Sequence, residues 1–373
     1  MSSNKKNSDN NKLDINVKLI EHKKISDDSS NFLKINISGS IINYIILNTL
    51  RRVIYELIPA YAFTNENIII EKNTSIFNND YMRLRLINFP IWGIINDIDT
   101  LDQLETLENN ANTNTFDMKK ETFETLKSYE EKKIMERIDV FTMKIDIKNN
   151  TPNILNVTTS QATFIYKGNV IESPYKKELL IIKLKPGEEF LATCYSTLHI
   201  PIKKINFLQC SACNYEQIND TSFDFYIESS KQITEKNLLI RACMIVIKKI
   251  TNLNNSIITK LSEYNNNDKK DNYDIIEDVN REQDTNKLNH LTQGILKIEH
   301  ESHTFGNIIT RLLQDDEDIT FAGFKIDQLL IKELTISYKT NGKNIKDIFN
   351  RITSKCIKIF EKLQNNFENL KIE

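Results

Sequence analysis

The chain has 373 residues, with 49 Lys and Arg against 51 Asp and Glu, so its formal net charge is −2. Without a basic excess, a protein that grips nucleic acid over a broad surface is disfavoured. The 5 cysteines are too scattered for a disulfide framework. No apolar run approaches the roughly 20 residues that cross a bilayer. We therefore expect a soluble intracellular protein with no membrane partner and room for more than one domain.

A strand and a helix begin the structured part of the chain. Phe32 to Ser38 alternates apolar and polar residues, which is the period of a half-buried strand. From Ile42 onward apolar residues recur with helical spacing, and Pro59 ends the helix because proline disfavours helical geometry in the residue before it. Two further strands are expected, from Asn67 to Glu71 and from Tyr81 to Ile91.

The middle of the chain has the character of an insertion. Leu101 to Ile138 is charged and helix-forming, and a run starting at Phe141 alternates as a strand does, with more strand-like sequence up to Leu184. Pro186-Gly187 marks the return to the first domain. A long amphipathic helix near Thr234 to Leu261 closes that domain.

The same order of elements returns near the C-terminus. Residues 263–290 are rich in Asn, Asp, Lys and Glu, which is typical of a linker. Beyond them the patterns predict a strand, a helix, two strands and a final amphipathic helix, at 295–300, 305–313, 320–325, 333–339 and 348–367.

Two motifs are common to both copies. Asn48 and Arg52 match Asn307 and Arg311 at the same i, i+4 spacing, and Ala60-Tyr61-Ala62-Phe63 is paired with Phe321-Ala322-Gly323-Phe324. Two related halves in one chain indicate a fused pseudo-dimer that covers its apolar helices by pairing them. The side chains expected at this contact are Ile46, Leu50, Val53, Leu57, Phe305, Ile308, Leu312, Phe349, Ile352 and Phe360.

We therefore predict an α+β protein with two related units, each an antiparallel sheet with helices, and an α+β insertion in the first unit. The expected domains are a disordered N-terminus (1–12), the larger unit (13–94 and 183–262), the insertion (95–182), the linker (263–290) and the smaller unit (291–373).

Several stretches resemble the alpha-like subunits of multisubunit DNA-directed RNA polymerases, the superfamily of the bacterial alpha amino-terminal domain. Asn48-Thr49-Leu50-Arg51-Arg52-Val53 with Pro59-Ala60-Tyr61-Ala62 resembles the larger subunit. His300-Glu301-Ser302-His303-Thr304-Phe305-Gly306-Asn307 is similar to the smaller one. Fusion of the two in one chain looks like the arrangement of large cytoplasmic DNA viruses.

The resemblance implies a non-catalytic platform on which the two largest polymerase subunits dock. Its contact residues would be Asn48, Arg51, Arg52, Tyr55, Asn307 and Arg311. Other small polymerase subunits would be further partners, and DNA and RNA would be contacted only through the complex. No cofactor is expected in this chain, because the catalytic magnesium would belong to a partner subunit. The implied location is the host cytoplasm, with packaging in the virion left open.

Two alternatives have support in the sequence. One is a viral adaptor or structural protein that keeps the pairing helices without a polymerase partner. The other is a self-contained enzyme that uses His300 and His303, although Thr304 as a helix N-cap favours a structural reading of that stretch.

Cys210-x-x-Cys213 could be a metal or redox pair, but no second pair accompanies it and zinc requires four ligands. On a strand these two cysteines are expected to point to opposite faces, so a structural role is favoured.

Overall fold

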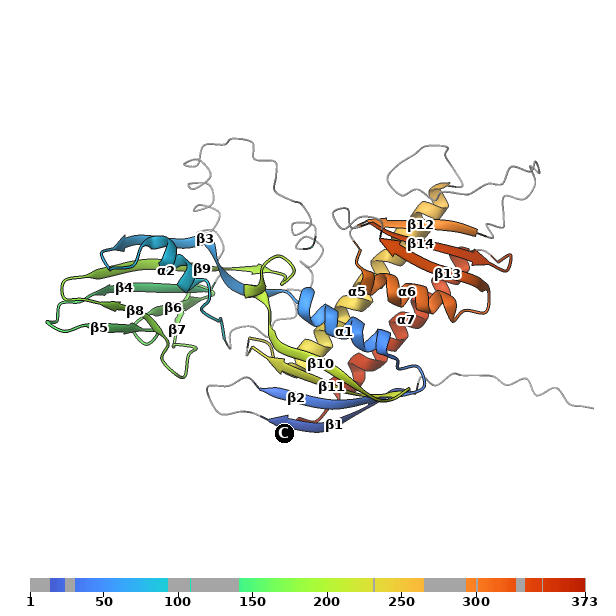
Figure 1. The fold of residues 1–373 in the computed structure, drawn as a ribbon, viewed down its shortest axis with the longest axis horizontal. Coiled ribbons are helices and arrows are strands. Elements are labelled where there is room, and N and C mark those ends of the chain that lie inside the picture. The colour runs from blue at the N-terminus through green and yellow to red at the C-terminus, as the bar shows by residue number, and fades with distance from the viewer. Residues whose placement is uncertain are drawn as a thin grey trace, which may run out of the picture.

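The computed structural model describes residues 14–23, 31–92, 108, 141–230, 232–264, 293–299, 301–326, 333–343 and 345–372 (Figure 1). The first unit and the body inserted in it contain β1 (Asn16–Lys23), β2 (Phe32–Ser38), α1 (Tyr44–Glu56), β3 (Ala60–Asn73), α2 (Asn79–Leu86), β4 (Thr142–Lys148), β5 (Leu155–Thr158), β6 (Thr163–Tyr166), β7 (Asn169–Ile171), β8 (Leu180–Leu184), β9 (Glu189–His199), β10 (Cys210–Asn219), β11 (Ser222–Ser229) and α5 (Glu235–Tyr264). The second unit contains β12 (Gln293–Glu299), α6 (His303–Gln314), β13 (Ile319–Ile326), β14 (Glu333–Thr340) and α7 (Ile345–Glu368).

The first unit is built on an antiparallel sheet in the order β1-β2-β11-β10. In β2 the alternation predicted from sequence is observed, because Leu33, Ile35 and Ile37 are fully buried on one face. Leu33 and Ile35 pair with Ile227 and Phe225 of β11, so apolar side chains meet across the two strands. This face of the sheet lies against the helices.

The second unit repeats this sheet without its outer strand. Its order is β12-β14-β13, so β12, β14 and β13 take the places of β2, β11 and β10. In both units the strand that starts the repeat is followed by a short helix, α1 or α6, and the long helix α5 or α7 comes last. The predicted α+β class, with antiparallel sheets and helices, is confirmed.

One predicted correspondence between the two copies is wrong. Ala60 to Phe63 begins β3, which pairs with β9 in a separate five-stranded sheet, whereas Phe321 to Phe324 lies in β13 beside β14. The counterpart of β13 is β10, which follows α1 only after a long insertion. Short apolar strand sequences are similar enough to be matched across non-equivalent positions.

The inserted body has its own hydrophobic core. Its sheet runs β3-β9-β4-β6-β7, with the pair β5-β8 and helix α2 packed on it. The core includes Phe63, Ile68 and Met82 as well as Phe141 and Phe190. Most of 60–91 therefore belongs with the insertion, and the predicted bounds of 95–182 are too narrow on both sides. The N-terminus 1–12 and the linker from 265 onward lie outside the described residues. So does the predicted charged helix, of which only Glu108 is described.

The strand predicted from Tyr81 to Ile91 is a helix over its first part. Asn78 caps α2 by accepting a hydrogen bond from the Tyr81 N–H at 2.8 Å. Met82 and Leu86, four residues apart, are fully buried. Arg85 then donates to the carbonyls of residues 180 and 181 in β8, which holds the helix on the inserted sheet.

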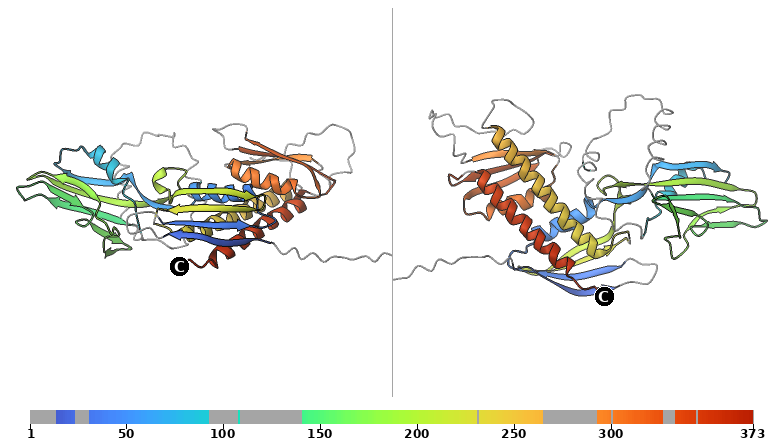
Figure 2. Two further views of the ribbon diagram at one scale, coloured as in Figure 1. Left: turned by 60° about the horizontal axis from the view of Figure 1, so that its bottom comes forward. Right: turned by 180° about the vertical axis from the view of Figure 1, so that it is seen from behind.

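Helices α1, α5, α6 and α7 share one core to which both units contribute. Helices α5 and α7 lie side by side and antiparallel, as seen from behind in Figure 2. Lys236, near the start of α5, donates to the carbonyls of Glu368 and Leu370 at the end of α7. Asn254, nearer the end of α5, donates to Asn350 Oδ1 at 3.1 Å near the start of α7.

The two short helices begin differently, which gives a test of α1. Asn43 Oδ1 accepts hydrogen bonds from the N–H groups of Ile45 and Ile46 at 3.0 and 3.1 Å, whereas Ser302 makes no side-chain cap bond to α6. Asn43→Ala should lower the free energy of unfolding by about 1 kcal/mol. Ser302→Ala, the matched control, should change it by less than about 0.5 kcal/mol. Urea unfolding of both variants measures the difference, and equal losses would contradict it.

Candidate protein interface on helices α1 and α6

Helices α1 and α6 pack against each other, and each exposes the same line of polar residues. On α1 the line is Asn48, Arg52 and Glu56; on α6 it is Asn307, Arg311 and Asp315. Spacing of i, i+4, i+8 places each set on one helix face. Arg52 pairs with Glu56 at 2.6 Å, and Arg311 pairs with Asp315 at 3.2 Å.

The arginines remain accessible to a partner. The side chains of Arg52 and Arg311 are 43 % and 51 % exposed. An exposed i, i+4 pair contributes only about 0.3–0.5 kcal/mol, so its arginine can exchange that contact for a carboxylate or carbonyl of a docking protein at little cost. The sequence prediction missed Glu56 and Asp315, although their equal spacing from the two arginines was available in the sequence.

Two residues predicted for the interface make contacts within the chain. Arg51 donates to Asn48 Oδ1 from Nε and Nη2 at 3.1 and 2.8 Å, and its guanidinium lies 6.0 Å from the centre of the Tyr55 ring. The Tyr55 hydroxyl accepts a hydrogen bond from the Cys213 N–H at 2.8 Å, and burial raises the pKa of Tyr55. Tyr55 thus holds α1 on β10, whereas Arg51 makes its contacts within α1. Contact of either residue with a partner stays a prediction.

Helix α6 is attached to its own sheet in the corresponding way. Gln314 occupies the place of Tyr55, and its Nε2 donates to the Ala322 carbonyl of β13 at 2.9 Å. The strands contacted, β10 and β13, are the equivalent strands of the two sheets. Each short helix is therefore fixed to its sheet near its C-terminal end, while its Asn–Arg–acid line faces outward.

The apolar residues predicted to pair the halves all contribute to the shared core. Nine of them are buried there, and Leu312 is partly buried against it. The nine are Ile46, Leu50, Val53, Leu57, Phe305, Ile308, Phe349, Ile352 and Phe360.

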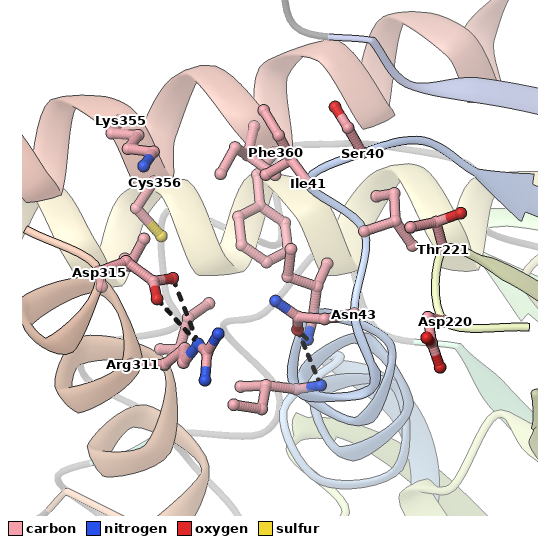
Figure 3. A pocket seen from close by; sticks show the side chains of 16 residues that line it. Ser40, Ile41, Asn43, Asp220, Thr221, Arg311, Asp315, Lys355, Cys356 and Phe360 are labelled. Atoms are coloured by element: carbon pink, nitrogen blue, oxygen red, sulfur yellow. Dashed lines mark hydrogen bonds and ion pairs between the residues drawn. The ribbon is translucent and has the colours of Figure 1, made fainter.

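A pocket of about 330 Å³ lies where the two units meet (Figure 3). Ile42 and Ile46 of the first unit and Ile308 and Ile359 of the second supply part of its apolar lining. The Arg311–Asp315 pair also borders it, so the polar line of α6 continues into the junction between the units.

The residues considered for an enzyme do not form a site in the described part of the chain. His303 is exposed at the start of α6, with its ring 5.9 Å from that of Phe324, while His300 lies outside the described residues. The N-cap of α6 is Ser302, so the prediction of Thr304 as cap is wrong; Thr304 is buried inside the first turn. Among the described residues, no group of three or more His, Cys, Asp or Glu could hold a metal ion.

Cys210 and Cys213 are both buried in the shared core, so the prediction that they point to opposite faces is wrong. The pairing of β10 with β11 shifts register between Cys210 and Ala212. This bulge adds a residue and brings both side chains to the same face. Burial raises the pKa of the Cys213 thiol, which favours the uncharged form.

Known proteins resemble this chain both in its second unit and over nearly its whole length. Residues 293–366 match the family model of the RNA polymerase Rpb3/Rpb11 dimerisation domain, which spans β12 to α7. A protein of Acanthamoeba polyphaga mimivirus, named as a DNA-directed RNA polymerase subunit, is 24 % identical over 366 residues, covering 96 % of this chain and 94 % of its own. The second unit is thus similar to an RNA polymerase dimerisation domain, and the chain as a whole is similar to a viral RNA polymerase subunit. Domains of the Rpb3/Rpb11 type are non-catalytic parts of the polymerase, in agreement with the prediction from sequence.

The helices that the structure describes include none with the length and apolar character needed to cross a membrane.

The attachment of α1 to β10 can be tested at Tyr55. Tyr55→Phe removes the acceptor of the Cys213 N–H and should lower the free energy of unfolding by about 1 kcal/mol. Tyr44→Phe on the same helix is the matched control, because Tyr44 is 60 % exposed and should tolerate the change. Chemical denaturation of both variants measures the effect; similar stabilities would show that the Tyr55 hydroxyl does not hold the helix.

Proposed function

We propose that this chain is the assembly platform of a DNA-directed RNA polymerase and that α1 and α6 dock its two largest subunits. The observation that carries the proposal is the repeat of one Asn–Arg–acid line on two adjacent helices of paired, related units. Homology to a polymerase subunit over nearly the whole chain supports it. In each line, the planar guanidinium can bind a carboxylate or a backbone carbonyl at two points.

The two lines offer related but different surfaces. Exposed Tyr44 at the start of α1 corresponds to exposed His303 on α6, and half-buried Arg51 corresponds to buried Thr310. A platform with two similar faces that differ in such details suits two large partners that have to be distinguished. By this proposal α1 receives the second-largest subunit and α6 the largest.

Several features follow from the proposed role. The catalytic magnesium would be held by a partner subunit, other small subunits would join the same complex, and DNA and RNA would be reached only through that complex. The polymerase would act in the host cytoplasm, and its detection in purified virions would decide whether it is packaged.

Charge reversal on the two lines tests the platform. Arg52→Glu and Arg311→Glu should each weaken retention of the large polymerase subunits by roughly tenfold or more. In each variant the glutamate would lie in the interface opposite the partner's carboxylate or carbonyl oxygen, which would repel it. The measurement is affinity purification of the tagged chain from infected cells, with quantitative mass spectrometry. Lys144→Glu, an exposed cation of β4 outside both lines, is the control.

Three outcomes of that purification are informative. Loss of one large subunit with Arg52→Glu and of the other with Arg311→Glu would support both docking assignments. Retention of both subunits by both variants would contradict the role of these lines. Recovery of the folded wild-type chain without polymerase subunits would favour the adaptor protein instead.

The pairing of the two units is tested by cutting between them. A protease site placed within 265–292 allows the folded full-length chain to be nicked. Because the units share one apolar core, the fragments should remain a one-to-one complex at micromolar concentration in size-exclusion chromatography with light scattering. Free separation of the fragments would refute the pairing.

A further inference from the structure

The two units are related by an approximate two-fold arrangement that allows position-by-position comparison. The N-cap positions of α1 and α6, Asn43 and Ser302, correspond to each other. In the long helices, the buried positions of α5 recur at equal spacing in α7: Leu238, Ala242, Val246 and Ile250 correspond to Ile348, Ile352, Cys356 and Phe360. The antiparallel contact of α5 with α7 is what a two-fold relation between the two units requires.

One of the two equivalent junctions between the units carries apolar side chains at three central positions. It is formed where α7 of the second unit meets the start of α1 of the first, and Ile42, Ile46 and Ile359 line the pocket there. These three side chains are at most 5 % exposed. Their positions correspond to Glu301, Phe305 and Lys249 at the other junction.

The other junction, where α5 meets the start of α6, contains a charged cluster. Lys249 Nζ lies 3.1 Å from Glu301 Oε1 of the second unit and 2.9 Å from Glu108 Oε1. It also lies 4.8 Å from the centre of the Phe305 ring. The Lys249 and Glu301 side chains are only 12 % and 18 % exposed, so this contact between the units is largely removed from water.

The charges in this cluster depend on one another. Burial alone would lower the pKa of Lys249, but the attraction of Glu301 and Glu108 outweighs it and raises that pKa. Burial raises the pKa of Glu301 although Lys249 opposes the shift. Each group therefore needs its partner, because a buried charge without a counter-charge is strongly disfavoured.

Pairing of like units would separate these partners. If two first units paired, Lys249 would face Ile42 and Ile46 and would keep only Glu108 of its own unit. If two second units paired, Glu301 would face Ile359 without a cation. Only the pairing of unlike units places Lys249 opposite Glu301 and brings the apolar Ile359 opposite the apolar Ile42 at the equivalent junction.

We propose that the Lys249–Glu301 pair makes the two related units pair with each other rather than with their own kind. The pair would act mainly by disfavouring the wrong pairings, since a buried ion pair adds little net stability over apolar side chains of similar size. A fused chain needs such selection because the units of neighbouring chains could otherwise exchange and link copies together. The proposal rests on the pairing of the units in one chain.

The test uses the full-length chain nicked within 265–292, unfolded in urea and refolded at micromolar concentration. Native mass spectrometry then counts first–second, first–first and second–second pairs. Lys249→Met should raise first–first pairs roughly tenfold or more, because the methionine can pack against Ile42 and Ile46. Glu301→Leu should instead raise second–second pairs, and the double variant should raise both.

The control makes the same chemical change at an ion pair away from the junction. Lys204→Met with Glu66→Leu removes an exposed pair, whose side chains are 40 % and 57 % exposed, and should leave only first–second pairs. Fold is checked by circular dichroism. If the double variant does not refold, the two single variants are judged by the same counts.

The outcomes separate this proposal from the pairing itself. Like pairs that appear in the predicted asymmetric pattern support selection by the ion pair. Variants that form first–second pairs exclusively, even with lower stability, would overturn it. Wild-type fragments that remain single would refute the pairing of the units on which the proposal rests.

Discussion

The structure depends on the antiparallel contact between α5 and α7. Each of these long helices carries an apolar stripe, and the stripes are buried in the shared core where the two helices meet. Because burial of apolar surface is the main driving force of folding, the contact places both sheets and both short helices at once. The Asn–Arg–acid lines of α1 and α6 come together only as a consequence of it.

A duplicated fold of this kind can keep its core symmetric while its surfaces diverge. The apolar positions of α5 recur in α7, and the anchoring of α1 by Tyr55 recurs in α6 as Gln314. The two units differ at the starts of α1 and α6. They also differ at the two junctions, where Ile42 and Ile359 correspond to the charged residues Glu301 and Lys249.

The sequence predicted the α+β class, the helices α1, α5, α6 and α7 and the apolar residues of the shared core, because strong periodicity reports directly on burial. It failed where a local pattern fits two structures. The segment after Asn78 fits the pattern of a strand, yet Met82 and Leu86 have helical spacing and the segment forms a helix. The β3 segment resembles β13 in composition, but the two strands are not equivalent. The Lys249–Glu301 contact joins residues far apart in the chain, so no local pattern could show it. The contact of Arg51 with Asn48 and the inward role of Tyr55 also required the three-dimensional structure, since helix position alone does not say which neighbour a side chain meets.

Site-specific photo-cross-linking within the assembled polymerase tests the central claim most directly. A photoreactive amino acid would replace Tyr44 on α1 or His303 on α6, two exposed and equivalent positions beside the polar lines. The platform account predicts that each position cross-links to one large polymerase subunit and that the two subunits are different. Cross-links from both positions to the same subunit, or none to either large subunit in an intact and active complex, would contradict it.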